Sequence, residues 1–297
     1  MRLPLTALLA TLLAAAALAQ TEANVAYGPH PRNVLDFYRA PSNEPTPLVV
    51  YIHGGGFVAG NKESLSAAMR DRLLNAGISV AAINYRYVSQ APFPAPMLDG
   101  VRAIQFLRSK AREWNLDKTR IAAMGGSAGA CMALWIGYHD DFVNPASTDP
   151  IERESSRLRA MAVNGAQTTL DPRLLSEFIS PATARHPSGP IFFGIPISEY
   201  GTPRARALFR DASPATYLSK DDPPAWLYYD EPDVDVPPNA RPGTGIHHPR
   251  FGAYLRELCI PLKLTCEVRL ATDYQDIRGA ANEQFAFLRV HLFKPGP

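Results

Sequence analysis

Apolar residues along this chain follow two alternating patterns. Short, almost wholly apolar runs predict strands covered on both faces of a sheet, at residues 48–52, 78–83, 121–124, 159–163, 226–229 and 262–270. Apolar residues spaced three or four positions apart predict helices between these runs, at residues 65–73, 101–111, 128–138, 251–258 and 282–292. The alternation predicts an α/β chain with a doubly wound, mostly parallel sheet, in which ligands lie outside the carboxyl ends of the strands.

Proline marks the region where this regularity breaks down. The chain contains 28 prolines, and thirteen of them fall between Pro181 and Pro249. Because proline has no backbone N–H to donate, such a density disfavours long regular elements. We predict a rigid cap inserted at about residues 167–222 of a single domain spanning 20–297, with short helices near 174–178 and 205–209. A surface loop without functional consequence is the alternative.

The first nineteen residues have the pattern of a cleavable export signal. Arg2 supplies the positive charge, residues 8–18 form an apolar run, and Ala17-Leu18-Ala19 offers a cleavage site before Gln20. The pattern predicts a signal peptide at 1–19 and a secreted or periplasmic protein. No later apolar run approaches the roughly 20 residues that a membrane span needs, so we expect none.

Composition narrows the function further. Hydrophobic residues make up 46% of the chain and charged residues 20%, which excludes a wholly disordered protein. With 30 Lys and Arg against 28 Asp and Glu, no charge excess favours nucleic-acid binding. Three cysteines exclude a disulfide framework but leave open one bond between Cys259 and Cys266. Phosphate-loop, dinucleotide and metal motifs are absent from the sequence, so we predict no cofactor and no metal.

The strongest chemical signal is Gly125-Gly126-Ser127-Ala128-Gly129, which follows one predicted strand and opens the next predicted helix. It matches the G-x-S-x-G pattern of a nucleophile presented on a sharp strand-to-helix turn. Glycines two positions before and after the serine let such a turn close, and the start of the helix favours developing negative charge. A structural turn is the alternative to a nucleophile at Ser127.

A second signal, His53-Gly54-Gly55-Gly56-Phe57, directly follows the predicted strand 48–52. Three glycines leave a loop without side chains, so backbone N–H groups can approach a ligand oxygen as in an oxyanion hole. A glycine run alone is also typical of hinges and phosphate loops. The two motifs follow different strands in the expected order, and together they are far more informative.

With this pair of motifs the chain resembles the α/β-hydrolase esterases, in particular the branch that includes hormone-sensitive-lipase-like and bacterial carbohydrate esterases. The resemblance covers about residues 47–293. It implies that Ser127 is the nucleophile and that the N–H groups of Gly55, Gly56 and Ala128 form the oxyanion hole. It also implies a structural role for His53 beneath the glycine loop.

The family order places an acid and then a histidine after the nucleophile. Asp233 fits the family's acid best, following the predicted strand 226–229, with Asp230 and Asp235 less well placed. Two adjacent histidines follow it on the same connection. We take His248 as the base and His247 as the alternative, because spacing alone does not say which of them faces Ser127. Their rival role is at the helix entry or on the substrate.

The chain departs from the family at several positions. Many members carry an acidic residue where this chain has Gly126 and a glycine where it has Ala130. The family's histidine follows the last strand, but residues 271–279 contain none, and Arg278 stands about where it is expected. Arginine stays protonated near neutral pH and cannot accept the serine proton. Downstream, His291 has the neighbours of a packing position.

Three hypotheses follow. The first is a secreted serine esterase that hydrolyses small acyl esters, with carbohydrate esters among its expected substrates. The second is a non-catalytic or weakly active binding protein of the hydrolase fold, favoured by the missing terminal histidine. The third is a peptidase of the same fold. The sequence does not give the oligomeric state.

Overall fold

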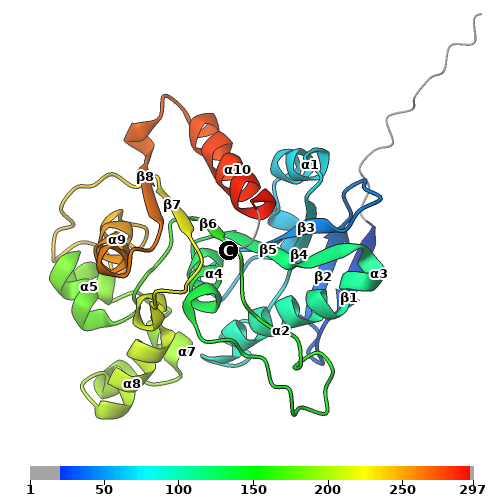
Figure 1. Ribbon diagram of the computed structural model, residues 1–297. Helices are drawn as coiled ribbons and strands as arrows, with labels where there is room; N and C mark the ends of the chain where they lie inside the picture. The colour runs from blue at the N-terminus through cyan, green and yellow to red at the C-terminus, as the bar shows by residue number, and fades with distance from the viewer. Residues whose placement is uncertain (1–20, 295–297) are drawn as a thin grey trace, which may run out of the picture.

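One sheet, with strand order β1-β2-β4-β3-β5-β6-β7-β8, organises the computed structural model, which describes residues 21–294 (Figure 1). Its strands are β1 (Glu22–Ala26), β2 (Val34–Tyr38), β3 (Thr46–Ile52), β4 (Ser79–Ile83), β5 (Leu116–Gly126), β6 (Met161–Asn164), β7 (Ala225–Tyr229) and β8 (Cys266–Leu270). From β4 to β8 along this order every neighbouring pair is parallel. All six predicted strands are present, so the predicted fold class is confirmed. The predicted signal peptide lies outside the described residues.

The sequence reading missed two strands at one edge of the sheet. β1 pairs with β2 and β2 with β4, both antiparallel. Four of the five residues of β1 are exposed, so it lacks the continuous apolar run that identified the other strands. The sheet is therefore mixed at this edge and parallel from β4 onward.

Helices cover both faces of the sheet in two apolar layers (Figure 1). On one face lie α1 (Ala67–Asn75) and α10 (Ile277–Phe293), whose Leu73 and Leu288 share a buried cluster with Trp226. The other face carries α2 (Ala95–Ser109), α3 (Ala111–Trp114), α4 (Ala128–Tyr138) and α9 (Arg250–Leu262). None of the helices within 21–294 combines the length and apolar content that crossing a bilayer requires.

Helix α4 is buried along its whole length. It runs beneath the centre of the sheet, against α2, where a side chain at Gly100 would come within 2.7 Å of Met132 Sδ. A helix with no polar face is stable only inside the core. This burial fixes the start of α4, and with it the residue that precedes the helix, Ser127.

Between β6 and β7 the chain leaves the sheet and forms the segment we call the cap, residues 167–222. Its helices are α5 (Pro172–Phe178), α6 (Pro181–Ala184), α7 (Gly189–Phe193) and α8 (Pro203–Ala212), with short 3-10 turns at Ile197–Glu199 and Pro214–Tyr217. Each of these helices has a proline in its first two positions, where the missing N–H costs nothing. The prolines thus start short helices, two of them at the predicted places.

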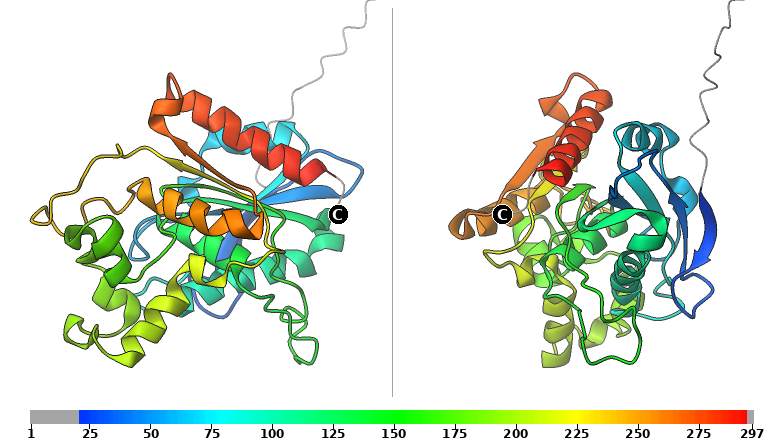
Figure 2. Two further views of the ribbon diagram at one scale, coloured as in Figure 1. Left: turned by 60° about the vertical axis from the view of Figure 1, so that its left-hand side comes forward. Right: turned by 45° about the vertical axis from the view of Figure 1, so that its right-hand side comes forward.

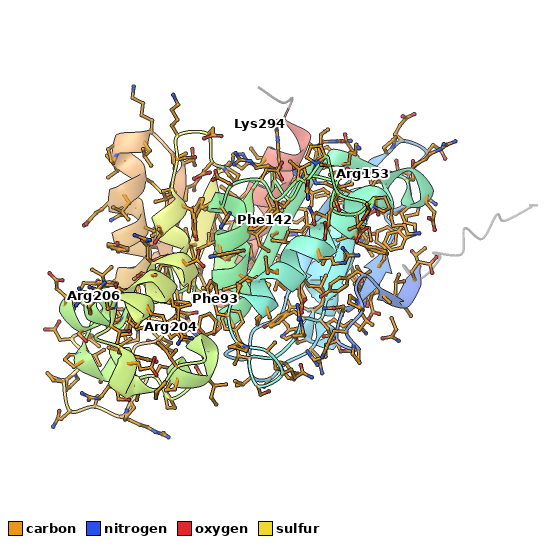
Figure 3. The ribbon with its side chains drawn as sticks, turned by 90° about the horizontal axis from the view of Figure 1, so that it is seen from below. Phe93, Phe142, Arg153, Arg204, Arg206 and Lys294 are labelled. Atoms are coloured by element: carbon orange, nitrogen blue, oxygen red, sulfur yellow. The ribbon has the colours of Figure 1, made fainter. Side chains whose placement is uncertain are left out.

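The cap lies on the side of the sheet opposite to α1 and α10 (Figure 2). It joins the core through aromatic packing: Phe93 N–H donates to Phe192 O at 2.8 Å, and the two rings lie 5.6 Å apart. Seen from below, Phe93 lies between the arginine-bearing cap helix and the core helices (Figure 3). The cap therefore roofs the carboxyl end of the central strands.

Candidate active site

Ser127 occupies a strained turn between β5 and α4. Its backbone has φ 52° and ψ −119°, a region that non-glycine residues rarely adopt. The flanking glycines are required by contact: a Cβ on Gly129 would lie 2.1 Å from Ile52 O, and one on Gly125 would lie 2.6 Å from the same oxygen. The turn can close only because both positions lack a side chain, as the sequence predicts.

The glycine loop lies directly against this turn. A Cβ on Gly54 would meet Gly126 O at 2.8 Å and Ser127 Cβ at 3.5 Å. Gly55 and Gly56 have φ of 109° and 59°, so the loop follows a path suited to glycine. The two motifs, some seventy residues apart in the chain, thus meet at one edge of the sheet.

Backbone N–H groups of both motifs lie at this junction. Within residues 21–294, the N–H groups of Gly55, Gly56 and Ala128 donate to no acceptor. Ala128 begins α4, where the first N–H groups have no partner inside the helix. Gly56 and Ala128 line the same cavity as Ser127. They are suitable donors for a negatively charged oxygen.

His53 is fully buried beneath the glycine loop. Its Nδ1 donates to Gly54 O at 2.7 Å, while its Nε2 accepts from Arg32 at 3.3 Å, and the ring stacks on Tyr85. Burial lowers the pKa of His53 to about 4, with the Arg32 charge acting in the same direction. A neutral imidazole with both nitrogens engaged supports the loop and is unsuited to proton transfer.

The imidazole that reaches the serine is that of His247. Its Nε2 lies 2.8 Å from Ser127 Oγ, a hydrogen-bond distance. The ring packs over the backbone of Gly165, where a Cβ would come within 3.1 Å of it. Gln167 Nε2 donates to Ile246 O at 2.8 Å and to Gly165 O at 3.0 Å, which ties the histidine loop to the end of β6.

The carboxylate beside this histidine belongs to Glu231. Its Oε1 lies 3.4 Å from His247 Nδ1, an ion-pair distance slightly longer than a standard hydrogen bond. Glu231 is the second residue after β7, and sequence reasoning passed over it in favour of the family's acid position. The signal that could have found it is its place at the carboxyl end of a central strand.

Asp233 and His248, the acid and base expected from the sequence, lie apart from the serine. His248 is buried: its Nε2 donates to Val234 O at 2.9 Å, and its Nδ1 accepts from Arg250 N–H at 3.1 Å. Asp233 is 54% exposed and lies 3.6 Å from Arg250 Nε. Because both nitrogens of His248 are engaged, it cannot accept a proton from Ser127. His247, the alternative, is the histidine that contacts Ser127.

The stretch after β8, where the resemblance led us to expect a histidine, starts the last helix. Asp276 caps α10, and Arg278 pairs with Asp276 on the surface.

All three cysteines are free thiols, and those of Cys259 and Cys266 form a hydrogen bond with each other. Across 21–294 no cluster of His, Cys, Asp or Glu has the composition of a metal site.

A cavity of about 290 Å³ opens over Ser127 beneath the cap. Its walls are mostly apolar and include Phe57, Leu175, Phe192 and Phe193. None of its lining residues is Lys, Arg, Asp or Glu. A cavity of this size and character suits a small uncharged ligand next to the serine.

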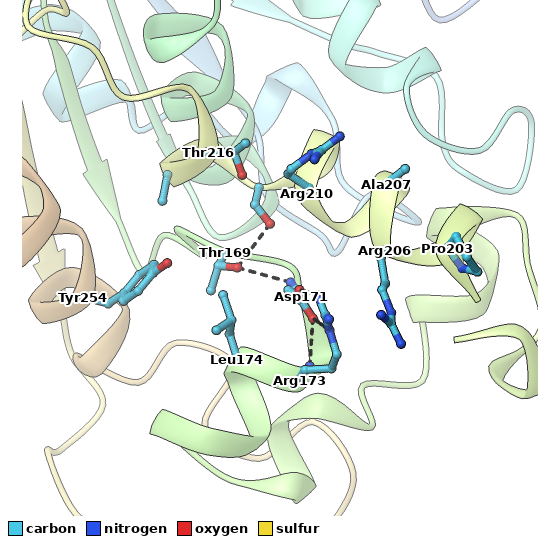
Figure 4. Close-up of a pocket in the computed structure, with 12 residues that line it drawn as sticks. Thr169, Asp171, Arg173, Leu174, Pro203, Arg206, Ala207, Arg210, Thr216 and Tyr254 are labelled. Atoms are coloured by element: carbon cyan, nitrogen blue, oxygen red, sulfur yellow. Dashed lines mark hydrogen bonds and ion pairs between the residues drawn. The ribbon is translucent and has the colours of Figure 1, made fainter. Parts of the chain in front are cut away.

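A second cleft lies on the other side of the segment that starts α5 (Figure 4). Arg173 pairs there with Asp171 at 2.5 Å, and Arg206 reaches from α8 toward the same gap. The lining of this cleft includes neither Ser127 nor His247. The serine and its histidine therefore identify the cavity under the cap as the candidate active site.

Sequence comparison assigns the chain to a family. The family model described as BD-FAE matches residues 35–241. The chain belongs to the BD-FAE family. The match ends just before His247, so this BD-FAE member carries its serine-contacting histidine outside the segment that the family model covers.

Among curated proteins, Esterase LipQ of Mycobacterium tuberculosis is 27% identical over 74% of this chain and 50% of its own length. The chain thus spans about half the length of that relative.

Solved structures show the same fold. A truncated carbohydrate esterase from gut microbiota aligns with a TM-score of 0.70 and 21% identity, over 92% of this BD-FAE chain and 96% of its own. An acetyl ester-xyloside bifunctional hydrolase from Caldicellulosiruptor lactoaceticus aligns with a TM-score of 0.68 and 22% identity, over 88% and 90% of the two chains. The α/β-hydrolase fold expected from the sequence is confirmed.

Proposed function

We propose that this protein is a serine esterase that hydrolyses small, uncharged carboxylic esters. The observation that carries the proposal is the 2.8 Å contact between Ser127 Oγ and His247 Nε2, beside unpaired N–H groups on a strained turn. Nucleophile, base and oxyanion donors are the parts that acyl transfer requires. The names of the relatives, which include esterases and carbohydrate esterases, support the same chemistry.

In the proposed mechanism, Ser127 Oγ attacks the ester carbonyl while His247 Nε2 takes its proton. Glu231 faces Nδ1, where it favours the tautomer that leaves Nε2 free and stabilises the imidazolium that forms. The N–H groups of Gly56 and Ala128, together with that of Gly55, donate hydrogen bonds to the negative oxygen. His247 then gives the proton to the leaving alcohol, and water releases the acyl group by the same route.

We assign the proton transfer to His247 in place of the histidine that follows the last strand in the family. A triad whose acid and base share the connection between β7 and α9 differs in chain order from the usual one, but the geometry of the groups defines such a triad. The 3.4 Å separation of Glu231 from His247 is compatible with this role, since catalytic contacts are often looser without substrate.

Turnover of p-nitrophenyl acetate by wild type and Ser127→Ala tests the proposal. We expect a burst of nitrophenol in wild type and a fall in kcat of roughly 10³-fold or more in the variant. Labelling by a fluorophosphonate separates the esterase from a binding protein of the same fold, since only an activated serine reacts quickly. Equal slow labelling of Ser127→Ala and wild type would favour the binding protein.

We further propose that the protein is exported and that its esters are carried by carbohydrate. The export proposal rests on the pattern of residues 1–19, and the mass of the mature N-terminus, expected at Gln20, tests it. The carbohydrate proposal rests on the two carbohydrate-active structural relatives. Acetate release from acetylated xylo-oligosaccharides, compared with ethyl acetate, tests it.

A further inference from the structure

Among the polar residues of the cap that line the cavity holding Ser127 and His247 are His186 and Tyr200. Neither takes part in the proposed proton transfer. Most of the remaining wall is aromatic or aliphatic. Polar groups in such a wall fix the orientation and the identity of a ligand.

The hydrogen bonds of His186 define its tautomer. Its Nδ1 accepts from the backbone N–H of Ser188 at 3.2 Å and contacts Ser188 Oγ at 2.7 Å. A backbone N–H can only donate, so Nδ1 carries a lone pair and the neutral ring holds its proton on Nε2. Burial and the neighbouring His247 both lower the pKa of His186, which keeps the ring neutral.

The Nε2–H of His186 is left free to donate. Among the described residues it has no hydrogen-bond partner, and the nitrogen retains accessible surface. The ring lies against Gly243, where a Cβ would come within 2.8 Å of His186 Cδ2. The glycine therefore leaves room for the ring in this orientation, and the orientation sets where the donor points.

The hydroxyl of Tyr200 is buried without any hydrogen-bond partner in the described part of the chain. Its ring is held edge-on by Phe209 at 4.9 Å and Phe193 at 6.1 Å. A Cβ on Gly189 would lie 2.8 Å from the hydroxyl oxygen. An unpaired buried hydroxyl is destabilising, and such groups call for a ligand or another functional reason.

We propose that His186 and Tyr200 recognise an uncharged hydroxyl group on the ester substrate. The imidazole offers a donor and the phenol can donate or accept, which is the complement of a hydroxyl. The absence of charged side chains from the lining argues against a carboxylate or an ammonium group on the ligand. This inference rests on the proposed esterase function and names a substrate class for it, esters of hydroxylated acids or of polyols.

Matched pairs of esters test the inference and locate the hydroxyl. Ethyl 3-hydroxybutyrate against ethyl butyrate tests a hydroxyl on the acid, and glycerol monoacetate against propyl acetate tests one on the alcohol. We expect wild type to favour the hydroxylated member of one pair by about 10-fold or more in kcat/KM. The ester without the hydroxyl leaves the polar groups of the site without a hydrogen-bond partner. Equal kcat/KM within both pairs would overturn the inference.

Tyr200→Phe removes only the unpaired hydroxyl. We expect the ratio of kcat/KM for the hydroxylated ester to kcat/KM for its partner to fall about 10-fold. Because the lost hydroxyl had no partner, the midpoint of thermal unfolding should rise, which separates recognition from a structural role. An equal fall for both esters, or a lower midpoint, would count against the assignment.

Binding to Ser127→Ala separates this inference from the proposed catalysis. Dissociation constants of the same ester pairs, measured by calorimetry, should keep the preference for the hydroxylated member, and His186→Phe in the same background should remove it. A retained preference in Ser127→Ala, combined with no turnover by wild type, refutes the esterase and supports the recognition site. Turnover without any preference supports the esterase and refutes the site.

Discussion

Glu231 and His247 leave the sheet on one connection, between β7 and α9, and their side chains meet at 3.4 Å across it. The residues between them hold Asp233 and Asp235, both of which pair with Arg250 at the start of α9. The more exposed carboxylates thus anchor the connection, and the half-buried one faces the histidine. This division of roles among neighbouring acids can be tested directly.

Replacing Glu231 should impair catalysis, and replacing Asp233 should not. Glu231→Gln removes the negative charge that faces His247 Nδ1, so we expect kcat to fall by about 10²–10⁴-fold. Asp233→Asn alters an exposed ion pair with Arg250, so activity should stay within about twofold. The two rates with p-nitrophenyl acetate check this, and a larger loss in Asp233→Asn would restore Asp233 as the acid.

The adjacent histidines should separate into a functional and a structural residue. His247→Gln removes the base, and we expect kcat to fall by roughly 10³-fold or more with little change in the free energy of unfolding. His248→Ala leaves Val234 O and Arg250 N–H without partners, and the free energy of unfolding should drop by about 1–3 kcal/mol. Urea unfolding and initial rates measure both. Reversed effects would assign the base to His248.

The glycines of the turn should differ sharply in their tolerance of alanine. A Cβ on Gly129 meets the fixed carbonyl of Ile52 at 2.1 Å, so Gly129→Ala should cost about 3 kcal/mol or more, or prevent folding. A Cβ on Gly126 finds no atom closer than 3.9 Å, so Gly126→Ala should change stability by less than about 1 kcal/mol. Similar unfolding midpoints for the two variants would contradict the packing of this turn.

Stability should fall as the solution is acidified, partly through His53. Burial lowers its pKa from 6.5 to about 4, so the unfolded chain binds the proton more readily. Above pH 6.5 His53 is neutral in both states and does not lower the free energy of unfolding. As the pH falls from 6.5 toward 4, its protonation in the unfolded chain lowers the free energy of unfolding by roughly 3 kcal/mol in all. His186 and His291, whose pKa values burial also lowers, add losses of the same sign.

The variant His53→Gln isolates this effect. Asp222, whose pKa burial raises to about 6, gains a proton in the native state over the same interval and offsets part of the loss in both proteins. Urea unfolding at pH 7 and pH 4.5 should therefore show a smaller difference in the variant than in wild type. If the free energy of unfolding changed equally between the two pH values in both proteins, His53 would not contribute to the loss of stability.

The sequence predicted the central sheet and the strained serine because each rests on a local pattern. Apolar runs identify strands buried on both faces, and glycine spacing identifies the turn at Ser127. The choice between His247 and His248 was beyond such reasoning, since adjacent side chains point in different directions and the family pattern ends before them. Glu231 was missed because the family's acid position pointed to Asp233, two residues further along the same connection.

In the proposed mechanism, residues up to His247 supply the acid, the base and the nucleophile. The last strand and α10 therefore supply no catalytic group. Sheet pairing ends at Leu270, and Leu288 of α10 and its neighbours contribute to the fold through their apolar contacts. The proposed chemistry therefore needs no histidine after the last strand, and a search for related proteins by a histidine at that place would overlook this chain.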